Sequence, residues 1–242
     1  IGMVKNFVNY IELGNFFSIN NLELKDISII DADFSITIED LVFFEEFLRT
    51  EPNENKIIFK NSNIFFKTED GEFLFLNKIN NSKFFYDSMN LENVSVFKSE
   101  IFNIPYKLVV KNNKYKKEIV SNFNSKKIRL NVENTINYSE EIKEGLIELL
   151  FINKKKSLNY EVAENSIKFL SEDKRELNGH IDFKPFYMNV GLSYDGISTK
   201  NLFKNDSVLV DLIRSEILNN QNLNVNINLN IKDITNIDEL NN

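Results

Sequence analysis

The sequence predicts a mostly β fold, in which strands pair antiparallel in a curved or rolled sheet, either groove-like or a sandwich. The commonest pattern is alternation of apolar and polar residues with a period of two, which is typical of strands with one buried face. Clusters of turn-forming residues recur at roughly 8–12 residue intervals, the spacing of all-β domains. The composition, 42% hydrophobic and 27% charged, is that of a globular protein. Only two segments follow a helical period, and they predict two short amphipathic capping helices.

Alternation is clearest near the C-terminal end, at residues 223–231. Five aliphatic residues fall on one face and four asparagines on the other, whereas a helix would scatter both sets around its axis. Shorter alternations predict strands at 128–132, 158–162 and 186–194. The five aliphatic residues are Leu223, Val225, Ile227, Leu229 and Ile231.

Other strands are predicted from β-branched or aromatic runs that lie between turn-forming residues. These strands are Leu22–Ile30, Lys56–Phe59, Ile64–Lys67, Phe73–Leu76, Lys83–Tyr86, Val94–Phe97, Tyr106–Val110 and Leu146–Phe151. The predicted breaks are 69–71, 80–82, 111–113, 153–155 and 172–174. No long parallel crossover is visible in this pattern, so mostly antiparallel pairing is expected.

Two segments follow the helical period. Thr37–Asp40 resembles a capping box with Asp in the usual place of Glu or Gln, and Pro52 lies beyond the helix that it begins. The second helix is predicted from about Asp206 to Leu218. Both polar faces are acidic, the wrong sign for an anionic membrane, so each helix is expected to cover an edge or end of the sheet. The apolar stripes are Leu41, Phe44 and Leu48 in the first, and Leu209, Leu212, Ile213 and Ile217 in the second.

No strong domain boundary interrupts the chain, and residues 1–242 are expected to form one β-rich segment of a larger protein. The most polar long connection, 111–117, is where a subdivision would fall. The chain begins at Ile1 rather than Met, so further residues are expected before it. No apolar run reaches the roughly 18–20 residues that span a bilayer.

Composition argues against several classes of chemistry. With no Cys, the chain has no disulfide, thiolate metal site or cysteine nucleophile. Its 7 Gly form no phosphate-binding motif, and the net charge of −7 gives no reason to bind nucleic acid. The single His, His180, is expected to be a surface residue at a strand end. Most acidic pairs lie in predicted turns, so we expect no catalytic residue, no metal, no cofactor and no enzymatic activity.

Pairs of adjacent aromatic residues recur along the chain. Adjacent residues of a strand point to opposite faces, so each pair directs one ring to the core and one to the second face. That second face is either covered as well or forms an apolar groove. The pairs include Phe16–Phe17, Phe43–Phe44, Phe65–Phe66, Phe84–Tyr86 and Phe186–Tyr187.

Three segments resemble bacterial AsmA-like proteins, which are related to TamB. They are Glu100–Lys107, Gly179–Tyr187 and Leu218–Ile231. In such proteins a Gly-x-Ile-x-x-x-Pro-Phe strand opens a β-unit and an alternating Asn-rich strand follows a short helix, and this order is present at 179–231. The resemblance covers about residues 57–237.

The resemblance implies a non-enzymatic periplasmic segment whose parent is anchored in the inner membrane and contacts membranes only through that missing anchor. The family's β-rich body is thought to curl into a groove that shields phospholipid acyl chains between the inner and outer membranes, in outer-membrane biogenesis. The implied partners are acyl chains and neighbouring repeats of the same parent chain. The groove candidates are Leu223, Val225, Ile227, Leu229, Ile231, Ile128, Leu130 and Val132.

The same apolar faces suit an ordinary closed core, so a purely structural or protein-interaction segment is the main alternative. A groove continuous to both ends favours lipid handling, and a core filled by side chains favours the alternative. A third hypothesis, a carbohydrate-active β-helix enzyme, requires acidic residues clustered in one cleft.

Overall fold

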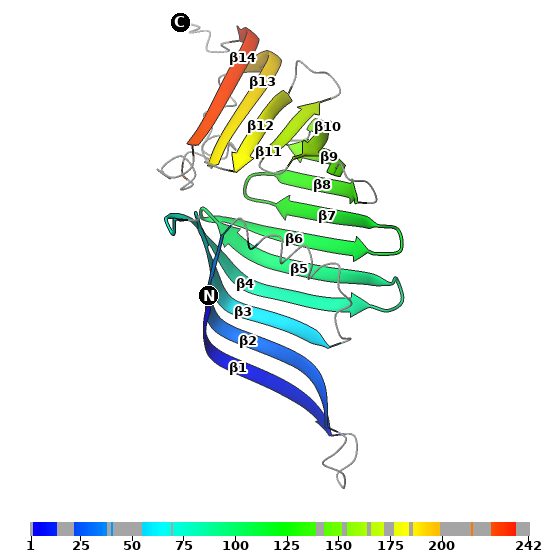
Figure 1. Cartoon of the computed structure of the whole chain (residues 1–242). Coiled ribbons are helices and arrows are strands. Elements are labelled where there is room, and N and C mark those ends of the chain that lie inside the picture. The colour runs from blue at the N-terminus through cyan, green and yellow to red at the C-terminus, as the bar shows by residue number, and fades with distance from the viewer. Residues whose placement is uncertain are drawn as a thin grey trace, which may run out of the picture. The chain divides into compact units, whose positions relative to one another are not determined.

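The computed structural model describes residues 2–13, 22–37, 40, 55–68, 70–138, 143–151, 154–163, 166–171, 177–183, 186–198, 214 and 224–235. These residues contain fourteen β-strands, which confirms a mostly β fold (Figure 1). The chain divides into two compact units, residues 1–123 and 124–242. Within each unit the strands are hydrogen-bonded in their order along the sequence, in a predominantly antiparallel open sheet.

The first unit is built from β1 to β7. Its strands are β1 (Gly2–Leu13), β2 (Leu22–Ile36), β3 (Lys56–Lys67), β4 (Phe73–Asp87), β5 (Glu92–Ile101), β6 (Ile104–Asn113) and β7 (Glu118–Ser125). Strands β1 and β7 fall where no strand was predicted. The expected subdivision at 111–117 spans the end of β6 and the following turn, and the two units divide after Phe123.

The second unit is built from β8 to β14. Its strands are β8 (Leu130–Asn137), β9 (Lys143–Phe151), β10 (Lys154–Val162), β11 (Ser166–Ser171), β12 (Leu177–Phe183), β13 (Phe186–Ser198) and β14 (Asn224–Thr235). Strand β14 forms one edge of this unit. In the described ranges of both units, no helix is long and apolar enough to cross a membrane.

The expected, mostly antiparallel pairing is confirmed, with exceptions at two places. Strand β2 pairs with β3 in parallel, and β13 pairs with β14 in parallel. Parallel neighbours need a crossover of a dozen or more residues, usually through a helix. The two segments predicted as capping helices fall in these connections. Apart from Thr37, Asp40 and Arg214, they lie outside the described residues.

The described start of the first crossover contains the predicted capping contacts. The Asp40 carboxylate accepts hydrogen bonds from the Thr37 backbone N–H at 2.7 Å and from the Thr37 hydroxyl at 3.1 Å. These bonds, the backbone one first, hold the pKa of Asp40 below its usual range. The N–H contact is the reciprocal half of a capping box, in which a side chain three residues on satisfies an otherwise unpaired donor.

Two pairs of predicted short strands are single long strands with irregularities inside them. Strand β3 continues through Asn61, which has a φ of 48°, and its parallel neighbour β2 has Asp31 at 55°. Strand β4 continues through a register shift between Ile79 and Asn81. The turns predicted at 80–82 and 111–113 are therefore wrong, because these residues lie within β4 and β6. Asn and Asp tolerate the left-handed region, so an interrupted strand resembles a turn in sequence.

The Ser62 hydroxyl supplies hydrogen bonds where the ladder between β2 and β3 is interrupted, beside Asp31 and Asn61. It accepts from the Ala32 backbone N–H at 3.2 Å and donates to the Lys60 carbonyl at 2.9 Å. Ser62 is 1% exposed and Ala32 is 0% exposed, so no water replaces these bonds. The extra residue of this irregularity, Asn61, also resets the alternation of side chains along β3. Phe59 before it and Ile64 after it therefore lie on the same face of the sheet.

Replacing Ser62 with Ala should destabilise the first unit by about 1–3 kcal/mol, because the buried Ala32 N–H loses its acceptor. Urea unfolding followed by far-UV circular dichroism measures this change. Ser88→Ala, in an exposed turn, is the matched control and should alter stability by less than about 0.5 kcal/mol. Equal unfolding midpoints for the two variants would contradict the bridging role of the hydroxyl.

Candidate functional site

One face of the second unit is mainly apolar on all seven of its strands. The pairings from β8 to β14 contain no register shift, so residues joined by successive pairings share a face. One such row crosses the whole unit: Ile136, Gly145, Tyr160, Phe169, Gly179, Val190 and Ile227.

The predicted groove residues lie at the two ends of this apolar face. Leu130 and Val132 are on β8, whereas Ile128 is in the turn before β8, buried at 8% exposure. Strands β8 and β14 are six strand spacings apart, roughly 29 Å in a flat sheet. The predicted residues therefore share a face without forming one compact site. Val225, Ile227, Leu229 and Ile231 are on β14, and Leu223 lies outside the described residues.

The centre of the apolar face is formed by residues that the sequence-based selection of groove residues missed. Leu158, Leu177 and Val190 form a cluster with exposures of 5%, 8% and 7%. The alternations at 158–162 and 186–194 were the signal that would have included two of them. At the β14 end, Val225 is 39% exposed and Ile227 is 56% exposed. The face is thus closed by side chains in its middle and open at one edge. The partly buried residues around the cluster are Ile147, Leu149, Phe169, Met188 and Leu192.

Two glycines make room for aromatic rings on this face. The ring of Tyr160 lies where a side chain on Gly145 would stand, and the ring of Phe169 covers Gly179. Each is a directly opposed cross-strand pair. An aromatic ring laid over a glycine shields the exposed backbone and adds apolar contact. Burial raises the pKa of the Tyr160 hydroxyl.

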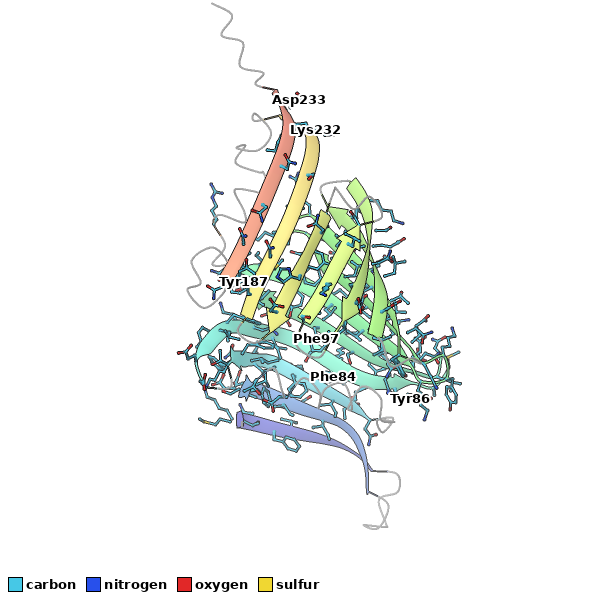
Figure 2. All side chains as sticks on the ribbon, turned by 45° about the horizontal axis from the view of Figure 1, so that its top comes forward. Phe84, Tyr86, Phe97, Tyr187, Lys232 and Asp233 are labelled. Carbon is cyan, nitrogen blue, oxygen red and sulfur yellow. The ribbon has the colours of Figure 1, made fainter. Side chains whose placement is uncertain are left out.

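The first unit has its own apolar face, formed mainly by phenylalanines. Phe34, Phe59, Phe84 and Phe97 make a chain of edge-to-face contacts across β2 to β5, with centroid separations of 5.6, 5.6 and 5.3 Å. Figure 2 shows Phe84 and Phe97 on the neighbouring strands β4 and β5. Edge-to-face packing matches the positive edge of one ring to the negative face of the next. We call this surface the phenylalanine face.

Polar groups interrupt the apolar surface at Tyr106. Its hydroxyl donates a hydrogen bond to the Asn77 side-chain carbonyl at 2.9 Å. Its ring stacks on the Phe123 ring with a centroid separation of 5.1 Å. Burial raises the pKa of Tyr106. The hydroxyl is therefore held in its protonated, hydrogen-bonded form.

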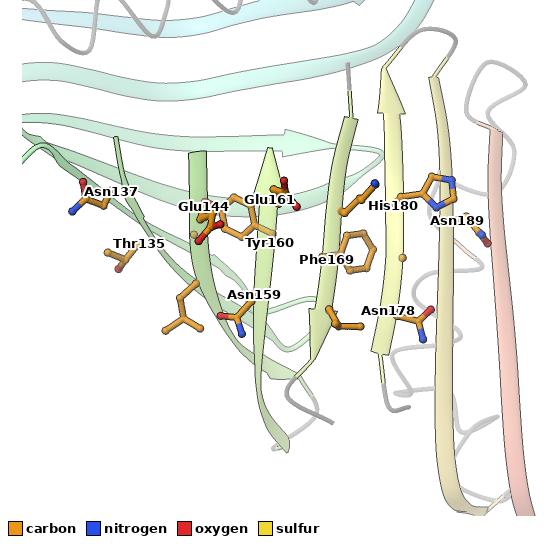
Figure 3. Close-up of a pocket in the computed structure, with 15 residues that line it drawn as sticks. Thr135, Asn137, Glu144, Asn159, Tyr160, Glu161, Phe169, Asn178, His180 and Asn189 are labelled. Atoms are coloured by element: carbon orange, nitrogen blue, oxygen red, sulfur yellow. The ribbon is translucent and has the colours of Figure 1, made fainter. Parts of the chain in front are cut away.

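The polar face of the second unit contains a cavity of about 1170 Å³ (Figure 3). Six of its lining residues form a row of directly opposed neighbours on β8 to β13. They are Asn137, Glu144, Glu161, Lys168, His180 and Asn189. Two leucines, Leu146 and Leu170, add apolar area to the lining.

His180 lies in the middle of β12, so the expectation of a strand-end residue is wrong. Its Nε2 atom is 3.5 Å from the Asp182 carboxylate, and its ring lies 5.9 Å from that of Tyr187. Glu144 and Glu161 stand side by side on adjacent strands, whereas glycoside hydrolysis needs carboxylates that flank a substrate from two sides. Among the described residues, no group of His, Asp and Glu is arranged to hold a metal ion.

Comparison with known proteins found no relative of this chain. No protein-family model, curated protein or solved structure matches the chain.

The glycine–aromatic pairing predicts whether replacing the glycine with alanine raises or lowers the stability of the fold. Gly→Ala in an unobstructed strand stabilises by about 0.4–1 kcal/mol. Gly145→Ala should instead destabilise by about 1–3 kcal/mol, since the methyl group displaces the Tyr160 ring. Urea unfolding of a double-mutant cycle with Tyr160→Leu tests this expectation. The cost of Gly145→Ala should largely disappear in the Leu background, and strictly additive changes would refute the contact.

The raised pKa of Tyr106 predicts a loss of stability in alkali. The unfolded chain releases this proton near pH 10, whereas the folded chain keeps it to higher pH. The contribution is complete below pH 10 and declines as the pH rises through the folded pKa. Tyr106→Phe should flatten the fall in unfolding free energy above pH 10, relative to wild type. The control is Tyr115→Phe, at a residue 66% exposed, and an identical pH profile for both variants would be the contrary result.

Proposed function

We propose that this chain is a non-enzymatic segment of an AsmA/TamB-like envelope protein, in which the apolar sheet faces shield lipid acyl chains between the inner and outer membranes. The observation that carries the proposal is the segregation of the two faces in the second unit. One face is mainly apolar from β8 to β14, and the other contains amides, charges and most of the cavity lining described above.

The open end of the apolar face has the chemistry that an acyl chain requires. Each buried methylene contributes about 0.8 kcal/mol, and apolar area contributes about 25 cal/mol per Å². Val225 and Ile227 expose their side chains on β14 and continue the surface of Val190 and Met188 on β13. A chain laid along β14 would therefore cover apolar area that water now contacts.

The family assignment rests on the order of elements at residues 179–231. Strands β12 and β13 are followed by the crossover 199–223 and then by the alternating strand β14. This order supports the resemblance of the Gly179–Tyr187 and Leu218–Ile231 segments to AsmA-like proteins. Periplasmic location and an inner-membrane anchor of the parent are proposed from that resemblance alone.

A purely structural or protein-interaction role is the second candidate, and one observation favours it. The centre of the apolar face is closed, with Leu158, Leu177 and Val190 at 8% exposure or less. The cavity, moreover, is lined mainly by residues of the polar face, together with Gly145, Tyr160, Phe169 and Gly179 of the apolar row. In this alternative, the edge strand β14 would receive a strand from a neighbouring repeat of the same parent chain.

Lipid extraction and native mass spectrometry of the full chain, expressed with an export signal, test the first candidate. Val225→Asp with Ile227→Asp should lower co-purifying phospholipid by about tenfold, because charge on this face opposes an acyl chain. The matched control is Asn224→Asp with Asn226→Asp. It adds the same charge to the opposite face of the same strand and should retain the lipid.

The two candidates give opposite results in this experiment. Loss of lipid only in the Val225/Ile227 variant, with unchanged circular dichroism, supports lipid shielding. A stable wild-type chain that carries no phospholipid supports the structural role. Equal loss in both variants would indicate a charge effect and contradict a groove on this face.

A further inference from the structure

Four lysines form a band on the polar face of the first unit. Lys60, Lys83, Lys98 and Lys107 come from β3, β4, β5 and β6, and all four are exposed. Lys60, Lys83 and Lys98 are next in sequence to Phe59, Phe84 and Phe97 of the phenylalanine face. Lys107 is next in sequence to Leu108, which lies directly opposite Phe97 and therefore shares that face. Since successive residues of a strand point to opposite faces, the lysines share the other face. We call this set the lysine band.

The strand register brings the lysine band together. Lys60 lies opposite Asn81, Asn81 lies opposite Lys98, and Lys98 lies opposite Lys107. Lys83 stands two residues from Asn81 on β4. The band spans three strand spacings, roughly 14 Å.

The charge of the band is not neutralised within the described part of the chain. Two other lysines of the same face are paired, Lys78 with Glu100 at 3.2 Å and Lys111 with Glu92 at 3.4 Å. The four lysines of the band make no ion pair with any described residue. Directly opposed like charges destabilise a strand pair, and Lys98 faces Lys107. A chain with a net charge of −7 thus concentrates unpaired positive charge on one open surface.

We infer that the lysine band docks the chain on the surface of an anionic phospholipid bilayer. The cations are spread over four strands rather than directed at one point, which matches many headgroup phosphates better than a single small anion. Lysine is a compact point charge, whereas nucleic-acid and bidentate phosphate sites favour arginine. No described residue of the first unit is arginine. Basic residues close to an anionic leaflet add attraction one by one, and salt screens it.

Docking through the lysine band uses a different unit and different residues from the proposed lipid face on β14. The apolar face can fail to hold lipid while the lysine band still binds a membrane, and the reverse holds equally. The two inferences are therefore tested by separate variants.

Vesicle co-sedimentation of the full chain tests the band. Vesicles of phosphatidylethanolamine with phosphatidylglycerol supply the anionic surface, and phosphatidylcholine vesicles supply the neutral one. The test variant replaces three residues of the band: Lys60→Gln, Lys98→Gln and Lys107→Gln. The control variant makes the same change in net charge at exposed turn residues: Lys116→Gln, Lys117→Gln and Lys126→Gln.

Wild type and the control variant should bind the anionic vesicles at low salt and be released at high salt. The band variant should bind roughly 100-fold more weakly. Its thermal unfolding should be unchanged or shifted upward, because the repulsion between Lys98 and Lys107 is removed. This result separates lost docking from lost folding.

Three results of the vesicle experiment would overturn the inference. They are binding of the band variant as tight as that of wild type, equal loss of binding in both variants, and binding of wild type to neutral vesicles as tight as to anionic ones. Binding of soluble polyphosphate without binding of vesicles would assign the lysine band to a polyanion and likewise overturn docking on a bilayer.

Discussion

The hydrogen-bonded register between neighbouring strands decides which side chains share a face, and every proposed surface depends on it. A slip of one residue would move a whole strand's apolar set to the other face. In the second unit the register is unbroken from β8 to β14, so distant alternations join in one apolar surface. In the first unit the same constraint gathers lysines from β3 to β6 that are widely separated in sequence.

Irregularities inside strands preserve this constraint in the first unit. Asp31 and Asn61 adopt positive φ at matching positions of β2 and β3, and β4 shifts register beside them. The alternation is reset in neighbouring strands together, so phenylalanines on both sides of the irregularity remain on one face. Ser62 satisfies backbone groups that the interrupted ladder leaves without a partner. The irregularity is therefore a coordinated feature of several strands rather than a local defect.

The sequence predicted local periods well and long-range pairings poorly. The alternation at 223–231 predicted β14, because five aliphatic residues on one face leave few other solutions. The turns predicted at 80–82 and 111–113 are wrong, because asparagine favours turns but here lies within strands, next to a register shift in β4 and in regular pairing in β6. Parallel pairing and the lysine band could not be predicted, because periodicity within a strand carries no information about its partners. For the same reason, the candidate groove residues omitted Leu177, which only the register places on that face.

At the edge strand β14, lipid on the apolar face and pairing with a further strand do not exclude one another physically. An acyl chain would cover Val225 and Ile227, whose side chains stand roughly perpendicular to the sheet. A strand from a neighbouring repeat would instead pair with the backbone N–H and C=O groups of β14, which lie in the plane of the sheet. An acyl chain has no donors or acceptors for those groups, so lipid alone leaves the edge to water or to another strand. Under the proposed function, an apolar surface that continued through neighbouring repeats would need both interactions. Strand pairing at the edge would extend the sheet, and the side chains of the added strand would supply the face on which lipid would move.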